Sequence, residues 1–369
     1  MSDHRIPSDH RIPPDAPTVF DVGSLISAAV ADGGVPGAVA MAGSGPDVLG
    51  EWVAGLACVS PRASMTADTV FDLASLTKVV ATTTLTLSVL GGELGSPAAR
   101  YLPSVVAPVT LRQLITHTSG LPASVTFYEW CRDREQLLAE LYATPLERPP
   151  GESVVYSDLG FMLLGEIVSV AAGEPLDRVF ADLVAGPLGM HDAGYNPRGG
   201  YPPAGPPAPA AGPADLARFA ATEVYDEVPW IGFVHDENAR VLGGVAGHAG
   251  LFATAADLAR FAQWWVSESD YGPVPAALRT TATTCQTGFL DGRRGFGWTC
   301  PGDRYDILGG HWPRTSVSHT GFTGTSLALD PVSGRWVVLL TNGVHSGRDA
   351  TAVKALRRSV HAALAPEHG

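Results

Sequence analysis

The spacing of apolar residues predicts a helix and two strands near the beginning of the chain. Residues 22–33 (VGSLISAAVADG) carry apolar side chains at helical intervals and stop at a glycine pair. Residues 37–44 and 48–57 are largely apolar and are separated by a Gly-Pro pair, a pattern typical of two strands joined by a turn.

A helical pattern dominates the middle of the chain. Residues 76–94 (LTKVVATTTLTLSVLGGEL) are apolar nearly all round, which predicts a buried central helix because little of its surface suits water. Three further segments have helical spacing: 111–120, 134–143 and 159–173.

A loop and a short repeat complete the middle of the chain. Residues 194–213 are rich in proline and glycine, which predicts a loop that is either a lid or an inert insertion. The heptapeptide ADLARFA occurs at 214–220 and again at 256–262. Two copies do not make a repeat architecture, so we expect two similar amphipathic helices.

Strand-like segments return near the end of the chain, at 316–321, 325–331 and 335–342, and a closing helix follows at 349–365. Strands at both ends and helices between them favour an α+β fold, in which both termini build one sheet. We expect a disordered tail at 1–16, a sheet domain from 17–110 and 270–369, and a mostly helical domain at 111–269. The functional cleft would lie between the two domains.

Composition excludes several classes of protein. The net charge is −13 and no run of Lys or Arg occurs, which argues against a nucleic-acid partner. The sequence contains no run of 18 or more apolar residues, so it does not suggest a membrane span. The first residues are polar and do not resemble a secretory signal, and we therefore expect a cytoplasmic protein. The four cysteines lack the spacing of a zinc site, and we expect no metal and no other cofactor.

One lysine stands out among the cations. Of 24 basic residues only Lys78 and Lys354 are lysines, and Lys78 follows Ser75 at i+3, on the same face of a helix that begins there. Positive potential at the helix start and a neighbouring ammonium both favour a serine alkoxide, which is one way to activate a nucleophile. The alternative interpretation is a serine that caps the helix and a solvated lysine.

Two later motifs favour the catalytic interpretation. Tyr156-Ser157-Asp158 precedes an apolar helix, and His319-Thr320-Gly321 ends a predicted strand. With Ser-x-x-Lys at Ser75, this order resembles the serine β-lactamase and D-amino-acid-peptidase superfamily, most closely its class C-like branch of esterases, amidases and peptidases. The similarity spans roughly residues 20–363 and implies a β-lactamase/transpeptidase-like fold, in which an antiparallel sheet is flanked by helices.

The resemblance implies a role for each motif. Ser75 would be the acylated nucleophile, Lys78 would hold its proton network, and Tyr156 would be the general base for acylation and the acid for the leaving group. A nearby ammonium favours the phenolate form of a tyrosine, which explains why Tyr156 and Lys78 belong together. The backbone N–H groups of Ser75 and Phe322 would form the oxyanion hole.

Substrate-binding residues are also implied, with two departures from the family pattern. They are Asp158, His319, Thr320, Gly321 and His248. Asp158 stands where many relatives have Asn, and an ionised carboxylate cannot donate a hydrogen bond to a substrate, although it can pair with Lys78. His319 replaces a lysine and removes a fixed cation that would hold an antibiotic's carboxylate. Both changes count against an efficient β-lactamase.

The sequence therefore indicates a metal-free serine hydrolase that cleaves a small ester, amide or peptide through an acyl-enzyme on Ser75. Three alternatives remain open. The acyl group could pass to an alcohol or amine, as in an acyltransferase of a biosynthetic pathway. The protein could be a β-lactamase or a D-aminopeptidase-type peptidase, or a non-catalytic binding protein of the same fold. The oligomeric state is left undetermined.

Overall fold

Strands from the two ends of the chain lie side by side in one antiparallel sheet. The computed structural model describes residues 22–197 and 218–367. The strand order in this part of the chain is β3-β2-β1-β11-β10-β9. The strands are β1 (Gly37–Ser44), β2 (Asp47–Cys58), β3 (Ala63–Ser64), β9 (Val317–Thr320), β10 (Ser326–Leu329) and β11 (Arg335–Thr341). Pairing of β1 with β11 joins the termini, as predicted for this α+β fold.

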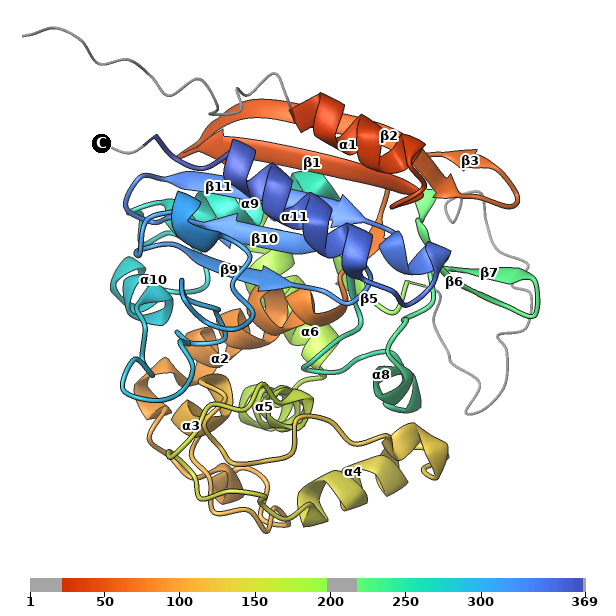
Figure 1. Cartoon of the computed structure of the whole chain (residues 1–369). Helices are drawn as coiled ribbons and strands as arrows, with labels where there is room; N and C mark the ends of the chain where they lie inside the picture. The colour runs from red at the N-terminus through yellow and green to blue at the C-terminus, as the bar shows by residue number, and fades with distance from the viewer. Residues whose placement is uncertain (1–21, 198–217, 368–369) are drawn as a thin grey trace, which may run out of the picture.

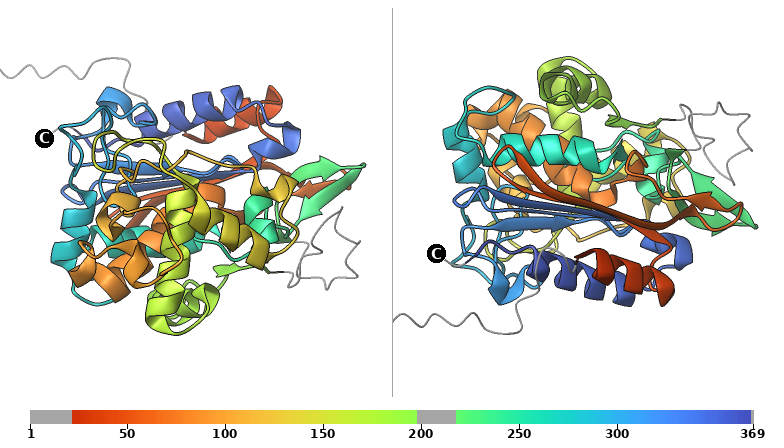
Figure 2. Two further views of the ribbon diagram at one scale, coloured as in Figure 1. Left: turned by 90° about the horizontal axis from the view of Figure 1, so that it is seen from below. Right: turned by 90° about the horizontal axis from the view of Figure 1, so that it is seen from above.

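Both faces of the sheet are covered, which explains why its strands are apolar at successive positions. On one face, Ala40 of β1 and Leu339 of β11 pack with α1 (Val22–Ala31) and α11 (Thr351–Ala363). On the other face, Val39 and Val338 join the larger core, which α9 (Ala255–Val266) covers. Figures 1 and 2 show α1 and α11 together on one side of the sheet and α9 on the other.

The remaining helices pack below this sheet in the view of Figure 1. The chain from Ala74 to Glu93 is helical throughout, with a wide π-helical turn at Lys78–Thr83 and then α2 (Thr84–Leu90). It packs against α5 (Asp158–Ala172). Around this pair lie α3 (Leu111–Ile115), α4 (Arg134–Ala143), α6 (Leu176–Phe180), α7 (Gly186–Leu188), α8 (Glu237–Val241) and α10 (Ala276–Thr283).

The helix Ala74–Glu93 is the buried central helix that its composition predicts. It spans 20 residues and is apolar enough to cross a bilayer, but 78 % of an 18-residue stretch within it is buried inside the protein. A core helix passes the same test of length and composition as a membrane span. We therefore assign it to the protein interior.

Two small sheets complete the structure. One has the order β4 (Phe71–Asp72), β8 (Leu251–Ala253) and β5 (Gly194–Tyr195), and the other pairs β6 (Ala221–Tyr225) with β7 (Val228–Ile231). The prediction of a loop from residue 194 is wrong at its first two positions, because Gly194 and Tyr195 pair with β8. The rest of the predicted loop, apart from residues 196 and 197, lies outside the described residues, as does the predicted tail at 1–16.

Only one of the two predicted ADLARFA helices falls within the described residues. Residues 256–262 belong to α9, as predicted. The first copy lies outside the described residues except for its end, where Phe219 forms a parallel bridge with Val70 and is not helical. The predicted helix at 111–120 is also shorter, because it ends at Ile115 and His117 adopts a positive φ of 58°.

The division into a sheet domain and a helical domain stays a prediction. Helix α9, which the prediction places with the helical domain, packs on β1 and β11 of the sheet.

Candidate active site

Ser75 lies at the start of the central helix, on a turn that is held by neighbouring strands. Ala74 has a φ of 46°, an uncommon conformation for a residue with a side chain. The buried carboxylate of Asp72 accepts hydrogen bonds from the N–H of Ala74 at 2.8 Å and of His235 at 2.6 Å. Thr325 donates to the carbonyl of Leu73 at 3.0 Å. These contacts offset the cost of the strained Ala74 backbone and fix the turn that carries Ser75.

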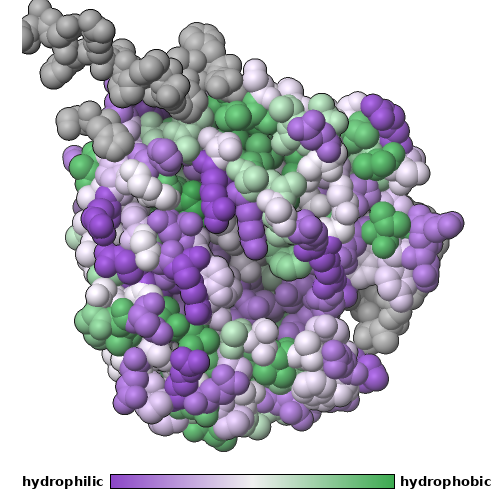
Figure 3. All heavy atoms as spheres, in the orientation of Figure 1, coloured by the Kyte–Doolittle hydropathy of each residue, from purple (hydrophilic) through white to green (hydrophobic). Residues whose placement is uncertain are grey.

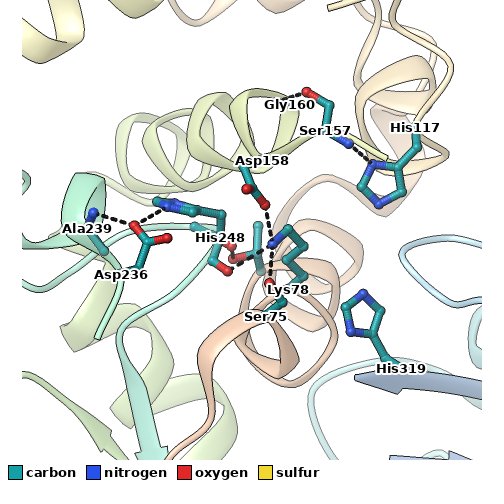
Figure 4. A network of polar contacts seen from close by, with 12 residues as sticks. Ser75, Lys78, His117, Ser157, Asp158, Gly160, Asp236, Ala239, His248 and His319 are labelled. Carbon is teal, nitrogen blue, oxygen red and sulfur yellow. Dashed lines mark hydrogen bonds and ion pairs between the residues drawn. The ribbon is translucent and has the colours of Figure 1, made fainter. Parts of the chain in front are cut away.

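Lys78 is fully buried and has three acceptors around its amine. Its Nζ is 2.9 Å from Ser75 Oγ, 3.1 Å from the carbonyl oxygen of His248 and 2.7 Å from Asp158 Oδ1 (Figure 4). An ammonium has three N–H donors, so this arrangement uses all of them. Burial alone would lower the pKa of Lys78, but the charge of Asp158 and the interactions with Tyr156 outweigh it and raise the pKa. Lys78 is therefore a cation in the resting site, and the solvated-lysine alternative is wrong.

Tyr156 comes from the segment that precedes α5. The buried His117 holds this segment, since its Nδ1 accepts from the N–H of Ser157 at 3.0 Å and its carbonyl accepts from Val155 at 2.9 Å. The rings of His117 and Tyr156 are 4.7 Å apart, and Lys78 Nζ lies 5.0 Å from the centre of the tyrosine ring. The three predicted catalytic side chains therefore meet, although Tyr156 comes from a different segment than Ser75 and Lys78.

The predicted oxyanion hole is compatible with the backbone geometry. Within residues 22–197 and 218–367, neither the N–H of Ser75 nor that of Phe322 donates to a protein acceptor, and both residues line the same cavity. Gly321 follows β9 and precedes Phe322, and its N–H donates to the carbonyl of Thr325 at 2.7 Å. A Cβ at Gly321 would overlap Thr325 Oγ1 and the carbonyl of Leu73. The absence of a side chain at Gly321 thus permits β9 to approach the turn that carries Ser75.

This close approach gives a prediction for Gly321→Ala. We expect the added methyl group to push β9 from the Ser75 turn, to lower stability by about 1–3 kcal/mol and to lower kcat. Thermal denaturation and steady-state hydrolysis would measure both effects. Gly95→Ala is the matched control, because a Cβ there meets no atom within 4 Å. Wild-type kcat in a stable Gly321→Ala protein would show that the approach is not needed.

The cavity next to Ser75 has a volume of about 260 Å³. Figure 3 shows the corresponding face of the molecule, which is hollowed near its centre and largely hydrophilic around the hollow. The lining residues are Ala74, Ser75, Tyr156, Asp158, His235, Asp236, Glu237, Ala249, Phe322 and Arg348. Of the predicted substrate-binding residues only Asp158 lines the cavity, whereas His319, Thr320, Gly321 and His248 are not among its lining residues.

His248 contributes to the site through its backbone carbonyl and through a contact of its ring with Asp236. Its carbonyl accepts from Lys78, while its ring Nε2 lies 2.8 Å from Asp236 Oδ1, pointing away from the lysine (Figure 4). Burial would raise the pKa of Asp236, but the interaction with His248 dominates and lowers it. Asp236 also caps α8 by accepting from Ala239 at 2.8 Å. The pair thus fixes the loop that supplies one acceptor of Lys78.

His319 is buried beside Tyr156, with ring centres 5.9 Å apart. Its Nδ1 lies 3.0 Å from the carbonyl oxygen of Thr320, and this contact makes Nδ1 the donor. Burial and the charges of Lys78 and Arg294 hold the pKa of His319 well below its usual range. The ring is therefore neutral at neutral pH, so this position carries no fixed cation, as the substitution of lysine by histidine implied.

Several residues of the cavity were not predicted from the sequence. The sequence patterns do not point to His235, Asp236, Glu237 or Arg348 as cavity residues. Arg348 pairs with Glu223 and Glu237, each through a contact of 2.6 Å. An aspartate before a short helix is a typical N-cap, and this pattern could have indicated the place of Asp236. Nothing near Arg348 in the sequence indicates that its side chain reaches the cavity. Among the described residues no group of three or more His, Cys, Asp and Glu side chains is arranged to hold a metal ion.

Comparison with known proteins gives a consistent family. Residues 22–362 match the family described as Beta-lactamase. A putative D-alanyl-D-alanine carboxypeptidase of Escherichia coli (strain K12) is 32 % identical over 307 residues, covering 76 % of this chain and 70 % of the relative. An N-acetylmuramyl-L-alanine amidase of Bacillus subtilis (strain 168) is 31 % identical over 321 residues, covering 77 % and 70 %.

A solved structure of similar fold is described as "EstCE1, a hydrolase with promiscuous acyltransferase activity". It has a TM-score of 0.71 at 21 % identity and covers 92 % of this chain and 98 % of its own. These matches extend over nearly the whole described structure, and they confirm the resemblance drawn from the three motifs. The chain belongs to the serine β-lactamase family of hydrolases.

Proposed function

We propose that this hydrolase cleaves a small amide or ester through an acyl-enzyme on Ser75. The observation that carries the proposal is the contact of Lys78 Nζ with Ser75 Oγ, at 2.9 Å, in a site where the ammonium is fully buried. A buried cation at hydrogen-bond distance stabilises negative charge on the serine oxygen more than an exposed one does, because water does not screen it.

The proposed reaction uses the groups that meet at the cavity. Ser75 Oγ forms a bond to the substrate carbonyl carbon while its proton passes to the phenolate of Tyr156. The N–H groups of Ser75 and Phe322 stabilise the tetrahedral oxyanion. Its collapse breaks the bond to the leaving amine or alcohol, which receives the proton from Tyr156. Water then attacks the acyl-enzyme by the same steps and releases the acid.

The names of two relatives support an amide as the first bond to test, since one is a putative D-alanyl-D-alanine carboxypeptidase and the other an N-acetylmuramyl-L-alanine amidase. The cavity is small, so we expect a short acyl or amino-acyl group beside Ser75. A small peptide, or a muramoyl-alanine amide, is therefore the substrate class that we propose. The expected cytoplasmic location stays a prediction that cell fractionation tests.

The test compares three substrate types on one preparation: a short-chain p-nitrophenyl ester, D-alanyl-D-alanine peptides and muramoyl-L-alanine amides. Mass spectrometry of the intact protein should detect an acyl group on Ser75 during turnover. A competing amine in the assay separates hydrolysis from acyl transfer, because a transferase would convert the acyl group to the new amide. Failure of a serine-directed fluorophosphonate to label Ser75 would instead support a non-catalytic binding protein.

A cephalosporin substrate tests the β-lactamase alternative. We expect a chromogenic cephalosporin to react with kcat/KM at least about tenfold below that of the best ester or amide. The reason is that His319 is neutral and Asp158 is already paired with Lys78, so neither offers a free donor or cation to a carboxylate. Efficient cephalosporin turnover would contradict this expectation and favour the β-lactamase function.

A further inference from the structure

A buried arginine, Arg294, lies against the ring of Tyr156. Its guanidinium carbon is 5.5 Å from the centre of the Tyr156 ring and 5.3 Å from that of Tyr305. The side chain is 1 % exposed, so water does not screen its charge. A cation within about 6 Å of an aromatic ring is attracted to its π electrons, and the attraction is larger where both are desolvated.

The neighbouring segment holds the guanidinium in a fixed orientation. Its Nη1 donates to Thr299 Oγ1 at 2.7 Å, and its Nη2 donates to Asp303 Oδ1 at 3.0 Å. Asp303 is itself fixed, because it accepts from the N–H groups of Arg293 at 2.8 Å and Tyr305 at 2.9 Å. Within the described part of the chain, Nε of Arg294 has no hydrogen-bond partner. A charge that is buried at this cost needs an explanation beyond packing.

Other charged and titratable groups also face the ring of Tyr156. The rings of His117, His319 and Tyr305 lie 4.7, 5.9 and 5.5 Å from the tyrosine ring. Burial holds the pKa of both histidines well below its usual range, so both are neutral. Lys78 is a second cation that contacts the ring, and each of the two cations is paired with a carboxylate, Lys78 with Asp158 and Arg294 with Asp303.

We propose that Arg294 is a positioning residue for Tyr156, which holds the ring by a cation–π contact. The proposal rests on the function proposed above, in which Tyr156 exchanges protons with Ser75 and with the leaving group. Arg294 acts through this ring, because it does not line the substrate cavity.

The experiment measures kcat and KM for Arg294→Met with an activated ester. Without the guanidinium, the ring of Tyr156 loses the contact that holds it. We expect kcat to fall about tenfold or more and KM to change less than about threefold, because the substrate does not contact Arg294.

Further variants separate this effect from loss of structure. Arg294→Met leaves Asp303 buried without its partner, so Arg294→Met/Asp303→Asn removes both charges of the pair. Arg294→Lys keeps a cation and should restore kcat at least in part. Arg293→Met is the matched control, since its Nε donates to Pro301 at 2.8 Å, away from the tyrosine. Thermal denaturation shows which variants are folded.

The outcomes distinguish this proposal from the proposed function. If a folded Arg294→Met or double variant keeps the wild-type kcat, or loses only thermal stability, the proposal is overturned. If Ser75→Ala and Tyr156→Phe also keep the wild-type activity, the proposed function itself has failed. Inactive Ser75→Ala and Tyr156→Phe proteins, together with unchanged Arg294 variants, would overturn the positioning role alone.

Discussion

Replacement of Ser75 by alanine should lower kcat/KM for hydrolysis by about a thousandfold or more. The substitution removes the oxygen that accepts from Lys78 at 2.9 Å and lines the cavity, so no acyl-enzyme can form at this position. It deletes a single polar atom, and we expect thermal stability to change little. Steady-state hydrolysis of an activated ester, with intact-protein mass spectrometry for the acyl adduct, measures the effect.

A matched control is Ser104→Ala, which removes the hydroxyl of an exposed serine outside the cavity. This variant should keep the wild-type rate and should still be labelled by a serine-directed fluorophosphonate. If Ser75→Ala hydrolyses the ester at the wild-type rate, Ser75 is not the nucleophile. The proposed mechanism would then be wrong even though the family assignment stands.

Replacement of Lys78 by methionine should lower kcat by about a hundredfold to ten-thousandfold. Methionine has a similar length but leaves Ser75 Oγ without its donor and Asp158 without its cation. The side chain of Asp158 is 27 % exposed, so water can reach the carboxylate and the protein should still fold. Stopped-flow measurement of the acylation burst separates slow acylation from slow release of the acyl group.

Arginine should not replace Lys78, although both are cations. The guanidinium is larger than the ammonium in a site with no exposed surface. Lys354→Met, at the exposed second lysine of the chain, is the control for loss of an amine. A Lys78→Met protein with kcat within about threefold of wild type would show that the ammonium serves structure alone.

Local sequence patterns were sufficient for the sheet and for the core of the site. Val39 and Val338 belong to short apolar segments that can be buried on both faces, and these segments are β1 and β11. Ser75 and Lys78 are three residues apart on one helix, so their contact depends mainly on helix geometry. The choice of lysine at this position, in a chain whose other cations are nearly all arginines, also indicates a special role.

Contacts between distant segments could not be read from the same patterns. Asp236 and Arg348 reach the cavity, and Arg294 reaches Tyr156, only because the turns that carry them pack against other parts of the chain. The sequence around Asp236 indicates a loop, that around Arg348 the end of a strand, and that around Arg294 a basic pair. No periodic pattern in the sequence predicts which side chain a turn will contact, because that contact depends on the whole path of the backbone.

The repeated heptapeptide shows the same division within one sequence. At 256–262 it follows Thr254, whose side chain caps the helix with Asp257, and its apolar face packs on the sheet. At 214–220 it follows Gly212 and Pro213, and of this copy only residues 218–220 are described, where Phe219 forms a parallel bridge with Val70. The sequence by itself determined which segments are apolar and which serine lies beside an amine. Tertiary structure decided the pairing of Phe219 and the charges around Tyr156, because packing between distant segments overrides local preference.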